Sequence, residues 1–100
     1  MAVTVVAKLK VQSGSEAQFT AAADKMIAHV KANEPGTLQY ILHRAGSDPS
    51  TFMFYEIYAD PAAMAAHSGS TAMAEFFGAV GGLMDGRPDI AIYEEVAGKK

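Results

Sequence analysis

The stretch TFMFYEIYA at residues 51–59 decides the fold. It has the composition of a β-strand, in which successive side chains point to opposite faces of the sheet. One face of the strand carries Met53, Tyr55 and Ile57, and the opposite face carries Phe52, Phe54 and Tyr58. Only Glu56 interrupts this apolar run. A strand that is apolar on both faces is covered twice, so we expect helices over one face and further protein over the other.

Three more segments show the alternation of strands. Residues 3–11 and 38–43 precede the central stretch, and residues 90–96 follow it. A loop of turn-forming residues at 46–50 joins the second strand to the central one, as in a hairpin. Glycines at 81–82 and 86 frame a segment before the last strand, which we expect to be mobile.

Two helical regions separate these strands. The first begins at Ser15, where Ser15 and Gln18 have the spacing of a capping box, and ends at the Glu34-Pro35-Gly36 turn. Its apolar residues recur at helical spacing and form one buried face: Phe19, Ala22, Ala23, Met26, Ile27 and Val30. The second region begins at Asp60-Pro61, a capping residue followed by the residue best suited to a first helical turn. Gly69 interrupts it, and Ser70 can cap its continuation.

The resulting order of elements is β-α-β-β-α-β. This order predicts an α+β fold of the ferredoxin-like kind, with a four-stranded antiparallel sheet and its helices on one face. We expect one domain over residues 1–100, with an ordered core from about 3 to 96. Because the other face of the sheet is also apolar, we expect it to pack on a second copy of the chain, sheet against sheet.

Composition excludes several classes of protein. The 100 residues include no cysteine, so disulfides, thiolate nucleophiles and zinc ribbons are excluded and a reducing compartment is favoured. The formal net charge is −3 and no basic cluster is present, so nucleic acid is not an expected partner. The apolar run at residues 2–7 is too short for a signal peptide, and no stretch is long enough to span a membrane. We therefore expect a cytoplasmic protein.

Motifs for known chemistry are mostly missing. The sequence contains no glycine-rich nucleotide motif, no GxSxG and no HExxH. The histidines at 29, 43 and 67 are too far apart for a local metal site, so we predict no metal. We expect His29 to lie at the surface or near a helix end, and His43 to be a half-exposed residue of a strand. His67 lies three residues after Met64 on a helix that covers the sheet, and either lines a pocket or packs in the core.

Glu56 is the second unusual position. Burying a carboxylate in an aromatic strand costs several kcal/mol unless the group is paired, hydrogen-bonded or protonated. Glu56 is therefore either functional or anchored by an ion pair with Arg44 or with a lysine across the sheet. The methionines at helical positions and in the last loop fit an adaptable core or a surface for a flat aromatic ligand: Met26, Met64, Met73 and Met84.

Short motifs along the chain point to a family. Glu34-Pro35-Gly36, Phe54-Tyr55-Glu56 and Ala66-His67 occur in order, and a closing Ile92-Tyr93-Glu94 follows. Over residues 3 to about 96 the chain resembles the antibiotic biosynthesis monooxygenase (ABM) domain, and within it the small YgiN-like quinol monooxygenases. This resemblance implies a dimeric α+β barrel of ferredoxin-like subunits, in agreement with the expectation from the strand pattern.

The resemblance also implies a cofactor-independent monooxygenase. Its substrate would be a small phenolic, quinol or polyketide-like aromatic, with O₂ as co-substrate and no bound cofactor. An electron-rich phenol that has lost its proton can reduce O₂ itself, so the protein supplies a base and a dry pocket. The resemblance implies that His67 is the base or anion-stabilising donor and that Glu56 orients it. The residues expected to shape the cavity are Tyr58, Tyr40 and Phe54, with Phe76 and Met84 on its lid side.

Alternative functions remain open on this scaffold. Haem degradation is disfavoured, because relatives that degrade haem carry an aromatic residue, usually Trp, at the position of Tyr58, and this chain has no Trp. An isomerase of a phosphorylated dicarbonyl could use His67 and Glu56 while Arg44 or Lys8 holds the phosphate. A dimer that binds aromatic compounds without converting them is the third possibility. Consumption of O₂ distinguishes the oxygenase from both of the others.

Overall fold

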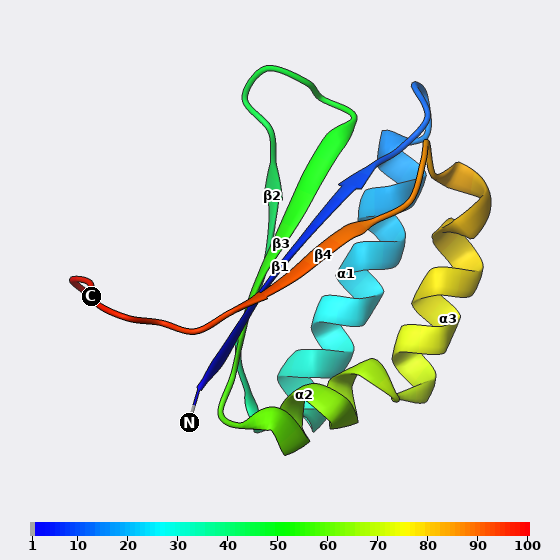
Figure 1. Ribbon diagram of the computed structural model, residues 1–100. Coiled ribbons are helices and arrows are strands. Elements are labelled where there is room, and N and C mark those ends of the chain that lie inside the picture. The colour runs from blue at the N-terminus through cyan, green and yellow to red at the C-terminus, as the bar shows by residue number, and fades with distance from the viewer. Residues whose placement is uncertain (1) are drawn as a thin grey trace.

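The computed structural model describes residues 2–100 and confirms the ferredoxin-like α+β fold. Its strands are β1 (Val3–Lys10), β2 (Thr37–Arg44), β3 (Thr51–Tyr58) and β4 (Asp89–Tyr93). Its helices are α1 (Glu16–Asn33), α2 (Pro61–Ser68) and α3 (Thr71–Val80), and a short 3₁₀ turn follows at Gly81–Leu83. The strands form one antiparallel sheet in the order β2-β3-β1-β4, and all three helices lie on the same side of it (Figure 1).

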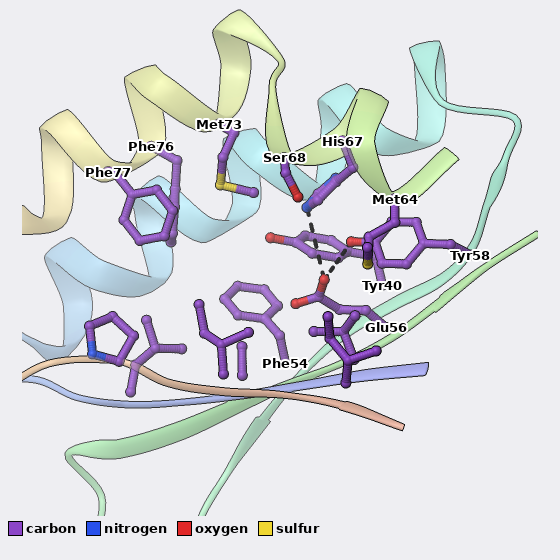
Figure 2. A pocket seen from close by; sticks show the side chains of 16 residues that line it. Tyr40, Phe54, Glu56, Tyr58, Met64, His67, Ser68, Met73, Phe76 and Phe77 are labelled. Atoms are coloured by element: carbon purple, nitrogen blue, oxygen red, sulfur yellow. Dashed lines mark hydrogen bonds and ion pairs between the residues drawn. The ribbon is translucent and has the colours of Figure 1, made fainter. Parts of the chain in front are cut away.

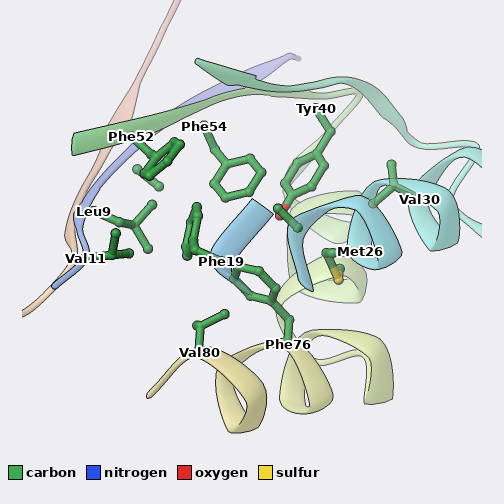
Figure 3. Packing of buried hydrophobic residues seen from close by; sticks show 12 residues of the cluster. Leu9, Val11, Phe19, Met26, Val30, Tyr40, Phe52, Phe54, Phe76 and Val80 are labelled. Carbon is green, nitrogen blue, oxygen red and sulfur yellow. The ribbon is translucent and has the colours of Figure 1, made fainter. Parts of the chain in front are cut away.

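The core lies between the sheet and the helices. The side chains of β3 that face the helices are Phe52, Phe54, Glu56 and Tyr58, and each is buried. Phe19 of α1 is completely buried, and its ring centroid lies 4.7 Å from that of Phe52 and 6.0 Å from that of Phe76 (Figure 3). Phe19 therefore joins the sheet to both long helices. The aromatic side chains that dominate this layer bury the largest apolar areas available to the chain.

The opposite face of the sheet is not covered by any element of residues 2–100 (Figure 1). The pairing of the strands brings apolar side chains together on this face: Val6, Ile41, Met53, Tyr55, Ile57 and Tyr93. Ile41 and Tyr93 are 47% and 56% exposed. The expectation that β3 is apolar on both sides is thus confirmed, and one of those sides faces outward.

Two of the predicted helix starts are confirmed by their caps. The Asp60 carboxylate accepts a hydrogen bond from the Ala63 amide at 2.8 Å, and Pro61 occupies the first turn of α2. The Ser70 hydroxyl accepts from the Met73 amide at 3.1 Å at the start of α3. The helical region after residue 60 is therefore two helices, divided at Gly69 as the sequence predicts.

The predicted capping box at the start of α1 is wrong. The Ser15 side chain makes no capping hydrogen bond. The Glu16 carboxylate instead accepts from the Gly14 amide at 2.9 Å and from the Ser50 hydroxyl at 2.5 Å. A carboxylate in the first turn of a helix is favoured by the helix dipole, but the amide that Glu16 accepts from precedes the helix, so Glu16 does not replace the cap.

The last strand and the preceding loop also differ from the sequence prediction. Strand β4 ends at Tyr93 rather than at residue 96, because Thr4 is the last residue of β1 with which it pairs. Val96, further along, is 94% exposed. The loop before β4, which the sequence predicts to be mobile, is tied to the end of β1 by backbone hydrogen bonds. The Gln12 amide donates to the Leu83 carbonyl and the Asp85 amide to the Lys10 carbonyl, both at 2.8 Å.

No helix within residues 2–100 combines the length and the apolar content needed to cross a membrane.

Candidate active site

A cavity of about 290 Å³ lies between the sheet and the helices α2 and α3 (Figure 2). Its walls come from all four strands and from α2, α3 and the loop before β4. Most of the residues that line it are apolar, and its polar groups gather at one end: Tyr40, Glu56, Tyr58, His67 and Ser68. The cavity thus lies beneath the helices α2 and α3.

His67 lies in the last turn of α2 and is 2% exposed. The cap at Asp60 and Pro61 sets where α2 begins, and therefore which face of the helix His67 occupies. Its ring packs against those of Tyr40 and Tyr58, with centroid distances of 4.8 and 5.3 Å. The alternative in which His67 only fills the core does not hold, because the side chain lines the cavity.

The two ring nitrogens of His67 have different surroundings. Nδ1 lies 2.8 Å from Oε1 of Glu34, and since a carboxylate only accepts, Nδ1 carries the proton of this hydrogen bond. In the neutral ring Nε2 is then unprotonated. Nε2 is buried and has no hydrogen-bond partner within residues 2–100; its nearest carboxylate oxygen, Oε1 of Glu56, is 4.0 Å away (Figure 2). The ring therefore presents a free lone pair at the polar end of the cavity.

Glu34 is the residue of the site that sequence reasoning missed. It was assigned only to the turn that ends α1, yet its side chain is 10% exposed and bonds to His67 and to the Thr37 hydroxyl, the latter at 2.8 Å. The hydrogen bond that orients His67 therefore comes from Glu34 and not from Glu56. One signal was available, because a carboxylate next to the C-terminus of a helix is unfavourable unless it has donors.

Glu56 points from β3 toward the helices and is 7% exposed. The Tyr58 hydroxyl donates a hydrogen bond to its Oε1 (Figure 2). Burial raises the pKa of Glu56 to about 7; the bond from Tyr58 opposes this rise, and the nearby Glu34 adds to it. Burial also raises the pKa of both Tyr40 and Tyr58 well above the usual range, so these phenols stay protonated as donors.

The proposed anchoring of Glu56 by a cation is wrong. The Arg44 guanidinium instead lies 5.1 Å from the centroid of the Phe52 ring. No lysine or arginine within residues 2–100 forms an ion pair with Glu56, and the one basic side chain beside it in these residues is His67, at 4.0 Å. Glu56 is thus a buried carboxylic group without a permanent counter-charge, in keeping with the rise of its pKa to about 7 by burial.

Most of the site residues expected from the sequence come together. His67, Glu56, Tyr58, Tyr40, Phe54 and Phe76 all line the cavity. Met84 does not, because its backbone bridges to Val11 and its side chain packs against the core near that residue. The residues that line the cavity near Phe76 instead are Met73, Phe77, Pro88 and Ile90.

The other two histidines lie outside the cavity. His29 of α1 is partly exposed, and its Nε2 lies 3.1 Å from Oε2 of Glu34. His43 is exposed on β2, with Nδ1 3.2 Å from the carbonyl of Ile41. Within residues 2–100, no three His, Cys, Asp or Glu side chains have the arrangement of a metal site.

Comparison with known proteins agrees with the fold and identifies the family. The family model for antibiotic biosynthesis monooxygenase matches residues 2–79. A provisionally named antibiotic biosynthesis monooxygenase of Caulobacter crescentus CB15 is 35% identical, with a TM-score of 0.92 over 96% of this chain and 91% of that one. Another of that name, from Nitrosomonas europaea, is 20% identical, with a TM-score of 0.90 over 95% and 90% of the two chains.

A further solved structure, of a Mycobacterium tuberculosis protein, aligns over 100% of both chains with a TM-score of 0.90 and 20% identity. At this lower identity the likeness concerns the fold. None of the curated proteins compared with the chain matches it. The match over residues 2–79, together with the relative that is 35% identical, shows that the chain belongs to the antibiotic biosynthesis monooxygenase family.

Proposed function

We propose that this protein is a cofactor-independent monooxygenase that oxidises a small phenolic, quinol or polyketide-like aromatic with O₂. The observation that carries the proposal is His67, whose Nδ1 is held by Glu34 while its buried Nε2 has no partner within residues 2–100. An unprotonated imidazole nitrogen at the end of an apolar cavity suits removal of a phenolic proton. A cavity of about 290 Å³ suits a flat molecule of one to three rings.

The reaction needs no external electrons. His67 takes the hydroxyl proton of a phenol that has a free para C–H, and the phenolate gives one electron to O₂. The phenoxyl radical and superoxide then join at the para carbon, and His67 returns its proton to the distal peroxide oxygen. Loss of the C–H proton to His67 breaks the O–O bond and releases hydroxide, which leaves with that proton as water. One oxygen atom ends in the quinone carbonyl and the other in water, and the substrate supplies all four electrons.

The neighbours of His67 would support the charged intermediates. Glu34 stabilises the imidazolium formed when Nε2 is protonated, because its carboxylate lies 2.8 Å from Nδ1. Tyr40 stays protonated and its hydroxyl can hydrogen-bond to a developing oxyanion, whereas the Tyr58 hydroxyl already donates to Glu56. Protonated Glu56 would add no negative charge beside the phenolate, and with a pKa of about 7 it can exchange a proton near neutral pH.

The decisive experiment measures O₂ consumption with 1-naphthol, which has a free para C–H, corrected for its reaction with O₂ without protein. We expect protein-dependent O₂ uptake and an equimolar quinone product. We also expect His67→Gln to lower the rate at least 100-fold with little change in probe binding. A probe that binds tightly but is consumed at the same rate by the wild type and His67→Gln would show a binding protein instead.

The isomerase alternative finds no support in the cavity. Arg44 stacks on Phe52, and Lys8 projects from β1 on the uncovered face of the sheet. None of the residues that line the cavity within residues 2–100 is a lysine or arginine, so a phosphate would have no cation there. Turnover of a dicarbonyl without O₂ would nevertheless support an isomerase over an oxygenase.

We also propose that the uncovered face of the sheet packs against a second copy of the chain. The face carries the apolar side chains named above, from Val6 to Tyr93, together with Lys8, and an antiparallel sheet of a folded protein seldom leaves so many apolar side chains in water. Tyr55 lies on the central strand β3, so Tyr55→Glu should produce a monomer. Light scattering on the wild type and this variant tests the proposal, and a monomeric wild type would refute it.

A further inference from the structure

The carboxylate of Glu34 lies between two imidazoles. Its Oε1 is 2.8 Å from Nδ1 of His67, and its Oε2 is 3.1 Å from Nε2 of His29. His67 lines the cavity, whereas His29 lines a groove between α1 and α3 on the other side of the helix layer. Glu34 thus joins a cavity residue to a residue that reaches solvent.

The two oxygens of Glu34 are held differently. Oε1 accepts from the Thr37 hydroxyl at 2.8 Å as well as from His67. Oε2 is buried and has no hydrogen-bond donor within residues 2–100, and its contact with His29 is an ion-pair distance without hydrogen-bond geometry. Because it has no other such contact, the position of Oε2 depends on His29.

The orientation of His29 is itself set by Asn33. The Asn33 amide donates to the backbone carbonyl of His29 at 3.2 Å, and the same nitrogen lies 3.3 Å from Nδ1 of the ring. An amide NH₂ that faces Nδ1 makes Nδ1 the acceptor, so the ring proton lies on Nε2, the nitrogen that is 3.1 Å from Oε2 of Glu34. The N–H dipole, or the full charge when His29 is protonated, then attracts the carboxylate.

We infer that His29 is a positioning residue for His67. It restrains the Glu34 carboxylate beside the negative end of α1, so that Glu34 keeps the proton of His67 on Nδ1 and leaves Nε2 unprotonated toward the cavity. The effect of this tautomer on turnover rests on the oxygenase proposed above, whereas the tautomer itself can be measured without substrate. Other charged groups are near: Lys25 and Glu75 line the groove with His29, and Glu56 lies beside Nε2 of His67.

The experiment compares three variants by ¹⁵N NMR of the histidine rings, at a pH where His67 is neutral. His29→Leu removes the contact with Oε2, whereas His29→Gln keeps an N–H in nearly the same place. His43→Leu is the matched control, because His43 is an exposed histidine far from Glu34 in the sheet. Thermal unfolding of each variant checks that the fold is retained.

In the wild type we expect His67 almost entirely as the Nδ1–H tautomer. His29→Leu should lower the ratio of the Nδ1–H to the Nε2–H tautomer about tenfold, whereas His29→Gln and His43→Leu should leave it within twofold. An unchanged ratio in a folded His29→Leu would refute the inference. If the ratio shifts as expected but no probe is oxidised by the wild type, the inference stands and the oxygenase proposal fails.

Discussion

The two ends of the cavity differ in how their residues are held. At the polar end, His67, Glu56 and Tyr58 are at most 7% exposed, and each has a fixed neighbour. At the other end, Phe77 is 41% exposed and Ile90 56% exposed, and both lie where the short β4 and α3 border solvent. Under the proposed function, proton transfer would belong to the rigid end, while the open end would admit the substrate and limit its size.

The largest effect is expected at the polar end, from Glu34→Gln. The variant loses the negative charge that faces Nδ1 of His67 and no longer determines which nitrogen carries the proton. Replacing a carboxylate beside a catalytic histidine by its amide costs about 10⁴-fold in the serine proteases, so we expect a loss in kcat of at least 10³-fold. The rate of O₂ uptake with 1-naphthol measures this loss. Thr37→Val, which keeps the charge, is the control; a Glu34→Gln rate within threefold of wild type would contradict the prediction.

The second prediction concerns Glu56 at the polar end and the pH dependence of the free energy of unfolding. Since burial raises the pKa of Glu56 from 4.5 to about 7, the folded protein holds this proton over a range in which the unfolded chain has lost it. The free energy of unfolding should therefore fall as the pH rises from 4.5 to 7, by about 3 kcal/mol from this group alone. Urea unfolding of the wild type and Glu56→Gln at both pH values tests this. Equal pH dependence of the two proteins would show that Glu56 ionises normally.

Substitutions at the open end should change ligand binding and the free energy of unfolding by smaller amounts. Phe77→Ala and Ile90→Ala remove apolar surface that lines the cavity but is already half in water. We expect each to weaken binding of 1-naphthol three- to tenfold and to lower the free energy of unfolding by about 1 kcal/mol or less. Fluorescence titration and urea unfolding measure the two quantities. A loss of several kcal/mol would mean that this end is part of the core rather than an entrance.

The smallest effect is expected for Met84, which the sequence placed on the lid side. Because Met84 packs next to Val11 and does not line the cavity, Met84→Leu should leave the affinity for 1-naphthol within twofold of wild type. Met73→Leu is the matched variant, since Met73 lines the cavity and has the same side chain. A larger change for Met84→Leu than for Met73→Leu would restore the lid interpretation.

Local patterns predicted the elements well, because each depends on neighbouring residues. The caps at Asp60 and Ser70 and the break at Gly69 are properties of short segments. The errors occurred where a distant partner decided the outcome. Ser50, 34 residues away, binds Glu16 at the start of α1, and the pairing of β4 with β1 stops at Thr4 although β1 begins at Val3.

The sequence by itself determined the order of strands and helices, the two apolar faces of β3 and the family, since alternation, spacing and short motifs carry that information. It also singled out His67 and Glu56 as residues out of place in apolar surroundings. Only the tertiary structure decided that Glu34 rather than Glu56 holds His67, and that Met84 lies outside the cavity. The contact between Glu34 and His67 joins residues that are 33 positions apart in the sequence. No local sequence pattern encodes the direction in which a buried side chain such as the Glu34 carboxylate points.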